Sequence, residues 1–136
     1  MKLVEVVKGD QTTDEAAQTV YDLCVLMNKT PVMCKDAPGF IVNRVARHYY
    51  LEAMKLVETN VATIENVDEV MEATGFKMGP FRLMDLIGND VNLAVSQSLY
   101  EASGFAERFK PSPLQQQKVA NGEFGKKAGK GYYNYS

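Results

Sequence analysis

The first 35 residues have the apolar spacing of a strand, a helix and a second strand. Residues 1–7 are largely apolar around Glu5, and Gly9-Asp10 ends this run. Thr12 with Glu15 three residues later predicts a capping box, and the helix that follows has apolar residues on one face: Ala16, Val20, Leu23, Cys24 and Met27. Residues 31–34 predict the second strand. Since two strands make a poor sheet alone, we expect the edge of a larger parallel sheet.

From residue 36 onward the spacing is helical. Asp36-Ala37-Pro38 predicts a helix start, and a stripe at helical spacing runs to about Glu58: Phe40, Asn43, Arg47, Tyr50, Met54 and Val57. Three more helical stretches are predicted, from Thr63 to Gly75, from Gly79-Pro80 to Ser103-Gly104 with a break at Gly88, and over residues 114–120. The fold class is therefore mainly α. The helical part is long enough to bury its own core.

Composition excludes several classes of protein. Hydrophobic residues make up 46% of the chain and charged residues 24%, which is typical of a folded domain and not of a disordered one. A net charge of -2 argues against the basic surface that nucleic-acid binding needs. No apolar run approaches the roughly 20 residues of a transmembrane helix. Glu5 interrupts the first apolar run, so no signal peptide is predicted, and we expect a cytoplasmic protein with no membrane partner.

Cysteine and histidine offer little chemistry. Cys24 and Cys34 are too few for a disulfide framework, and we expect buried free thiols. His48 is the only histidine, and it cannot form a metal site by itself. Nothing near it suggests a nucleophile system, so we expect a partly exposed helical residue and no metal.

Three residues allow a structural and a functional interpretation. Asn43 lies on the apolar stripe, where it is either a buried, hydrogen-bonded amide or a donor to a substrate oxygen; the residues alone favour the first. Glu5 is either solvated on the outward face of a strand or a carboxylate that orients a histidine. Lys127 lies in a Gly- and Lys-rich tail that lacks the phosphate-loop order. That tail is expected to be flexible and solvated, although a lysine there could meet a phosphate.

Six segments, in order, carry a resemblance to a known family. They are Met1 to Val7 (MKLVEVV), Lys35 to Arg44 (KDAPGFIVNR), Met78 to Phe81 (MGPF), Asp85 to Gly88 (DLIG), Pro111 to Pro113 (PSP) and Gly125 to Tyr133 (GKKAGKGYY). Each is modest alone, but their combination in this order is specific. The chain resembles the C-terminal part of the NAD-dependent L-3-hydroxyacyl-CoA dehydrogenases, including the 3-hydroxybutyryl-CoA enzymes.

The resemblance implies a fold and an activity. Residues 1–35 would be the end of a Rossmann-type NAD-binding domain, and residues 36–136 a helical domain for substrate binding and dimerisation. Glu5 matches the glutamate that orients the catalytic histidine, which the family has a few residues before the position of Met1. Asn43 matches the asparagine near the reacting oxygen, and Lys127 a lysine that approaches NAD. His48, Lys77 and Arg82 depart from common choices, and we expect only local effects.

Under this interpretation the chain alone is inactive, and it binds acyl-CoA as part of a whole enzyme of fatty-acid metabolism. It is also expected to form a homodimer, in which residues 1–35 could be exchanged between the two copies. A rival is a free-standing helical dimerisation or acyl-CoA-binding module without redox activity. A weaker third interpretation is the related helical domain of a phosphogluconate or hydroxyisobutyrate dehydrogenase. Upstream sequence encoding a GxGxxG turn and a histidine would favour the first.

Overall fold

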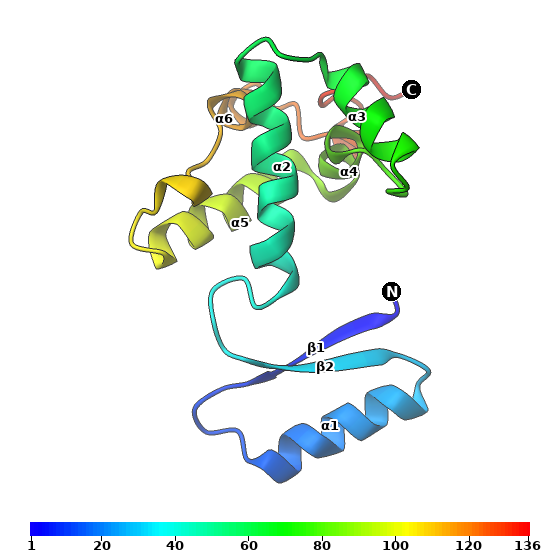
Figure 1. Ribbon diagram of the computed structural model, residues 1–136, viewed down its shortest axis with the longest axis vertical. Helices are drawn as coiled ribbons and strands as arrows, with labels where there is room; N and C mark the ends of the chain where they lie inside the picture. The colour runs from blue at the N-terminus through cyan, green and yellow to red at the C-terminus, as the bar shows by residue number, and fades with distance from the viewer. The chain divides into compact units, whose positions relative to one another are not determined.

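The computed structural model describes all 136 residues and divides them into two compact units, Met1–Arg44 and Val45–Ser136. The division falls in the first turn of α2 (Val42–Glu58), a helix of 17 residues. Figure 1 shows the elements in chain order, with strands only in the first unit. Each unit is described separately below.

The first unit is a parallel strand pair with a crossover helix. β1 (Leu3–Lys8) pairs with β2 (Thr30–Lys35) in parallel, from Leu3 opposite Thr30 to Lys8 opposite Lys35. α1 (Asp14–Leu26) connects the strands and packs along the pair (Figure 1). This arrangement confirms the strand–helix–strand prediction, because parallel neighbours need such a crossover.

The start of α1 differs by one residue from the predicted capping box. The N-cap is Thr13, whose hydroxyl accepts a hydrogen bond from the backbone N–H of Ala16 at 3.1 Å. The Thr12 hydroxyl instead accepts from the backbone N–H of Gly9 at 3.2 Å and closes the turn after β1. The capping-box prediction at Thr12 was therefore wrong. Of the two adjacent threonines, Thr12 closes the turn after β1 and Thr13 caps the helix.

The helix α1 leaves most of its apolar face uncovered within its own unit. Only Ala17 and Cys24 are buried, whereas five larger side chains are exposed: Val20, Leu23, Val25, Leu26 and Met27. An apolar surface of this kind is typical of a segment that packs against further structure.

The long helix begins later than its predicted start signal. The backbone N–H of Phe40 donates to the carbonyl of Ala37 at 2.8 Å, which closes a turn with Pro38 and Gly39 at its centre. Gly39 has φ 72° and Phe40 has φ 44°, both left-handed, so the chain cannot be helical there. Helix α2 therefore begins at Val42, and the prediction of a start at Asp36-Ala37-Pro38 was wrong.

The second unit is entirely helical apart from its tail. After α2 come α3 (Ile64–Ala73), α4 (Pro80–Ile87), α5 (Asn89–Ala102), the 3-10 turn η1 (Glu107–Phe109), α6 (Pro113–Ala120) and the 3-10 turn η2 (Lys126–Ala128). The N-caps Thr63 and Gly79 and the break at Gly88, which has φ 107°, agree with the sequence prediction. None of the helices combines the length and the apolar content needed to cross a bilayer.

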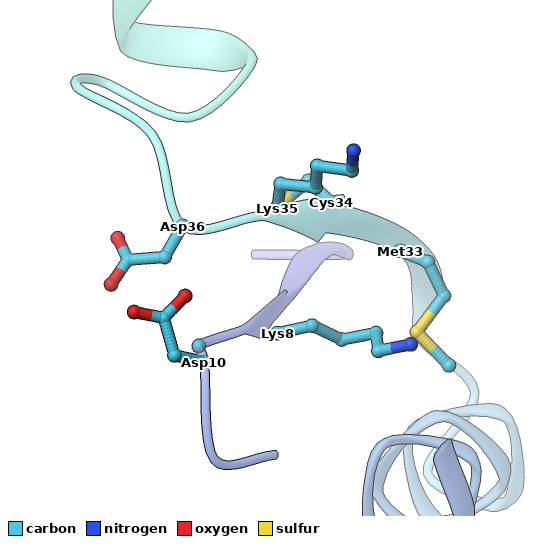
Figure 2. Close-up of a pocket in the computed structure, with 7 residues that line it drawn as sticks. Lys8, Asp10, Met33, Cys34, Lys35 and Asp36 are labelled. Carbon is cyan, nitrogen blue, oxygen red and sulfur yellow. The ribbon is translucent and has the colours of Figure 1, made fainter. Parts of the chain in front are cut away.

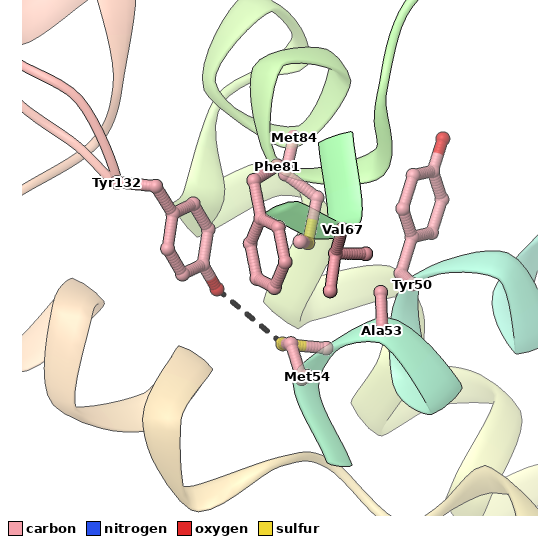
Figure 3. Close-up of a cluster of buried hydrophobic side chains, with 7 residues drawn as sticks. All are labelled: Tyr50, Ala53, Met54, Val67, Phe81, Met84 and Tyr132. Atoms are coloured by element: carbon pink, nitrogen blue, oxygen red, sulfur yellow. Dashed lines mark hydrogen bonds between the residues drawn. The ribbon is translucent and has the colours of Figure 1, made fainter. Parts of the chain in front are cut away.

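The core of the second unit brings α2, α3, α4 and the C-terminal tail together. Figure 3 shows its buried members: Tyr50, Ala53, Met54, Val67, Phe81, Met84 and Tyr132. Burial of a Met or Phe side chain stabilises a fold by about 1.5–3 kcal/mol. Tyr132 lies edge-on to Phe81, with ring centroids 4.8 Å apart, and its hydroxyl lies 3.3 Å from the sulfur of Met54.

A buried arginine joins α2 to α5 beside this core. Arg47 is 2% exposed, and its Nη1 donates to the carbonyl and the side-chain Oδ1 of Asn92, at 3.0 and 2.6 Å, and to Ser96 Oγ at 3.0 Å. Desolvation lowers the pKa of Arg47. The same Asn92 Oδ1 accepts from Gln115 of α6 at 2.8 Å, so one polar network fixes three helices.

Candidate functional site

Glu5 holds the start of α2 through one carboxylate oxygen. It is half-buried on β1, and its Oε1 accepts hydrogen bonds from the backbone N–H groups of Ile41, at 2.7 Å, and Val42, at 3.1 Å. These donors have no partner within the helix, and a negative charge is favourable at this end. The second oxygen, Oε2, has no hydrogen-bond partner in the chain. The solvated-strand interpretation of Glu5 was thus wrong, while its role towards a histidine stays a prediction.

Asn43 lies in the first turn of α2, next to Val42. Its side chain is exposed and makes no hydrogen bond within the chain. The buried-amide interpretation was therefore wrong: the stripe becomes buried only from Arg47 onward. The structure leaves the Asn43 amide free to donate to a ligand, while Glu5 fixes the helix end that carries it.

Lys127 is an ion-paired residue. Its ammonium lies 2.6 Å from Asp90 Oδ1 and donates to Asp90 Oδ2 at 2.7 Å. The hydrogen bond from Lys127 lowers the pKa of Asp90. Asp90 is in the first turn of α5, directly after the break at Gly88. Sequence reasoning missed this partner, because the two residues are 37 positions apart.

The tail that carries Lys127 is docked on α4. Asp85 is fully buried, and its carboxylate accepts from the backbone N–H groups of Tyr132 and Tyr133, both at 3.0 Å, and from the Tyr135 hydroxyl at 2.9 Å. A side chain at Gly131 would occupy the space of this carboxylate, since its Cβ would lie 2.0 Å from Asp85 Oδ1. The prediction of a flexible, solvated tail was wrong.

A pocket of about 590 Å³ lies at the carboxyl ends of β1 and β2 (Figure 2). It is lined by Lys8, Gly9, Asp10, Met33, Cys34, Lys35 and Asp36. Figure 2 shows the carboxylates of Asp10 and Asp36 on the same side of the pocket. In parallel sheets, ligands bind outside the carboxyl ends of the strands. Neither Glu5 nor Asn43 is among the lining residues.

A second pocket, within the helical unit, is almost wholly apolar. It has a volume of about 630 Å³ and is lined by Val45, Ala46, Tyr49, Tyr50, Phe76, Lys77, Met78 and Leu83. Tyr49 and Phe76 stack there, with ring centroids 4.9 Å apart. The Tyr49 hydroxyl is occupied, because it donates to the carbonyl of Met78 at 3.0 Å. This pocket fits an aliphatic chain, and nothing in the sequence pattern pointed to it.

The thiols and the histidine are largely as predicted. Both cysteines are free; Cys24 is buried, but Cys34 is only partly so. Desolvation raises the pKa of Cys34, with smaller effects from Glu5 and Asp36. His48 is partly exposed, and its ring centroid lies 5.2 Å from that of Phe109. No group of three potential metal ligands occurs in the structure.

The family model for the 3-hydroxyacyl-CoA dehydrogenase C-terminal domain matches residues 39–135, and that for the NAD binding domain of the same enzymes matches residues 1–37. A relative from Escherichia coli K12, a 3-hydroxyadipyl-CoA dehydrogenase, is 48% identical over 99% of this chain and 29% of its own length. The mitochondrial hydroxyacyl-coenzyme A dehydrogenase of Sus scrofa is 41% identical over 99% of this chain and 43% of its own length.

Two solved structures that this chain resembles are also 3-hydroxybutyryl-CoA dehydrogenases. The crystal structure of a 3-hydroxybutyryl-CoA dehydrogenase from Escherichia coli matches with a TM-score of 0.95 at 48% identity, over 99% of this chain and 29% of that one. The (S)-3-hydroxybutyryl-CoA dehydrogenase of Ralstonia eutropha also has a TM-score of 0.95, at 36% identity, over 100% of this chain and 48% of that one. The chain thus spans less than half the length of these relatives. It belongs to the 3-hydroxyacyl-CoA dehydrogenase family, with the helical C-terminal domain of that family preceded by the end of its NAD-binding domain.

Proposed function

We propose that the whole protein oxidises L-3-hydroxyacyl-CoA to 3-ketoacyl-CoA with NAD, and that these 136 residues supply part of its active site. In this proposal residues 1–35 belong to the NAD-binding domain and residues 36–136 form the substrate-binding and dimerisation domain. Family membership supports the reaction class. The chain has no histidine near Glu5 in sequence, so it should be inactive alone.

The observation that carries the proposal is that the two oxygens of the Glu5 carboxylate differ in their hydrogen bonding. One oxygen is anchored by the N–H groups of Ile41 and Val42, and the other is free. A histidine that acts as a base needs an acceptor on its second ring nitrogen to fix its tautomer. An anchored carboxylate with one free oxygen supplies such an acceptor, and it stabilises the imidazolium that forms.

Asn43 would act on the substrate oxygen, whereas Glu5 would act on the histidine. As the base removes the hydroxyl proton and the hydride leaves the same carbon, the substrate oxygen would become a carbonyl oxygen, and an amide donor would stabilise the charge that develops on it. Because the Asn43 side chain is exposed and has no partner in the chain, it can serve as that donor without breaking an internal hydrogen bond.

NAD, when bound, supplies the hydride acceptor. The pocket beside Lys8, Asp10 and Asp36 fits a nucleotide in its position, at the carboxyl ends of parallel strands. Its charge suits only the uncharged parts of a nucleotide, because Asp10 and Asp36 place two carboxylates in the pocket and Lys8 is ion-paired with Asp14. Lys127 would approach NAD only by sharing or leaving its ion pair with Asp90.

The apolar pocket between α2 and α4 is proposed to receive the acyl chain, since its volume and lining suit methylene groups. The relatives are named for different acyl groups, from hydroxybutyryl to hydroxyadipyl. The proposal also includes a homodimer, a cytoplasmic location and a place in β-oxidation.

The proposal is tested by NADH oxidation with acetoacetyl-CoA. The full-length protein, with the dinucleotide-binding sequence upstream of Met1, should turn over, and the purified 136-residue chain should not. Turnover by the chain alone, after contaminating host enzymes are excluded, would contradict the division of the active site. Binding of acyl-CoA by a full-length protein that never oxidises NADH would instead support the rival module without redox activity.

A further inference from the structure

Lys77 is the only charged residue among the eight that line the apolar pocket of the helical unit. It is exposed, and it follows Phe76, whose ring stacks on Tyr49 as part of the pocket wall. The pocket therefore has apolar walls, and Lys77 is the one lining residue that carries a charge. The hydroxyl of Tyr49 offers no competing donor, because it is already bonded to the Met78 carbonyl.

The Lys77 ammonium has no partner within the chain. Five lysines and arginines of the same unit are paired with carboxylates: Arg82, Lys110, Lys118, Lys127 and Lys130. Lys77 takes part in none of these ion pairs, and its ammonium makes no hydrogen bond within the chain. A cation beside an apolar pocket, with no internal counter-charge, is available to a ligand that has both an aliphatic chain and a negative charge.

We propose that Lys77 selects acyl chains that end in a carboxylate. The pocket walls would bury the methylene groups of the chain, and the ammonium would pair with its terminal carboxylate. The apolar walls suit a methylene chain and not the polar, phosphorylated part of coenzyme A, so the negative charge that meets Lys77 is placed at the end of the acyl chain. The assignment rests on the proposed function and narrows its substrate class to dicarboxylic 3-hydroxyacyl-CoA thioesters.

The test compares two substrates of equal chain length in the full-length protein, 3-hydroxyadipyl-CoA and 3-hydroxyhexanoyl-CoA. Wild type should have the higher kcat/KM for the adipyl substrate, and Lys77→Met should lower the adipyl-to-hexanoyl ratio about three- to tenfold. Lys77→Arg keeps the positive charge and should keep the preference. Lys55→Met is the matched control, because Lys55 is also exposed and unpaired but does not line the pocket.

An unchanged ratio in Lys77→Met would overturn the proposal. An equal loss with both substrates would also overturn it, because it would place Lys77 against the coenzyme A part or make it structural. A ratio that falls equally in Lys55→Met would show only a general charge effect and would overturn it too. If wild type turned over neither substrate, the proposed function itself would fail, and this assignment with it.

Discussion

The backbone N–H of Val42 donates to Glu5 Oε1 at 3.1 Å, and that of Ile41 reaches the same oxygen at 2.7 Å. A side chain on β1 thereby determines where the backbone of α2 becomes helical, one residue before Asn43. Glu5 and Asn43, the two residues proposed to take part in the reaction, are thus joined through a single helix end.

Glu5→Ala should loosen that helix end. It removes the acceptor for two N–H groups and the negative charge at the N-terminus, which together stabilise by about 1–2 kcal/mol. The measurement is hydrogen exchange at the Ile41 and Val42 amides, which should become faster. Glu5→Gln keeps an acceptor oxygen and should have a smaller effect. Unchanged exchange in Glu5→Ala would show that these hydrogen bonds do not hold the helix.

Asp85→Ala should release the C-terminal tail. It leaves the N–H groups of Tyr132 and Tyr133 and the Tyr135 hydroxyl without their acceptor, and a buried unsatisfied donor costs about 1–3 kcal/mol. We expect a total loss of about 3–5 kcal/mol in the free energy of unfolding. Thermal unfolding and tryptic cleavage of the tail provide the measurements.

The control for Asp85 is Glu107→Ala, which breaks only the exposed ion pair with Lys110 and should change stability by less than about 0.5 kcal/mol. Equal melting temperatures for Asp85→Ala and this control would contradict the tail-docking account.

The stability of the helical unit should fall in acid partly because of Glu123. Hydrogen bonds from Lys118 and then Lys130 lower the pKa of this carboxyl from 4.5 to about 2. The folded state thus binds the proton less tightly than the unfolded chain. The ion pairs contribute fully above about pH 4.5, and their contribution is lost as the pH falls towards 2. Denaturant titrations across this range should show a flatter acid limb for Glu123→Gln; an identical pH profile would count against the assignment.

The chain should self-associate in solution. Its first unit exposes an apolar helix face and a two-stranded sheet, surfaces that tend to find a partner in another copy. Light scattering over a concentration series should give twice the monomer mass, and a constant 15.1 kDa would refute this. Leu26→Lys on α1 should weaken association if this segment pairs, whereas Val61→Lys, at another well-exposed apolar position in the second unit, should not.

Local signals were sufficient for most of the elements. The threonine at 63, the Gly79-Pro80 pair and Gly88 each act on the backbone within a few residues, so their helix boundaries could be predicted. Two starts were misplaced for local reasons as well. Thr12 is taken up by a turn, and the left-handed Gly39 and Phe40 delay α2.

The contacts that hold the site together were beyond sequence reasoning, because they join distant positions. Glu5 meets residues 36 and 37 positions away, and Asp85 binds tail residues 47 to 50 positions away. No periodicity encodes such pairs. The position of Lys77 beside an apolar pocket depends in the same way on the packing of α2 against α4, so only local effects were predicted for it.

The amide of Asn43 tests the central claim most directly. In the full-length protein, Asn43→Ala should lower kcat with acetoacetyl-CoA by about 10²–10³-fold, corresponding to about 2.7–4 kcal/mol, and should change KM much less. Stability should be unaffected, because the side chain is exposed and unbonded. Asn66→Ala, which removes another exposed helical amide, should leave kcat unchanged. A kcat for Asn43→Ala equal to that of wild type would contradict the proposal that this residue stabilises the reacting oxygen.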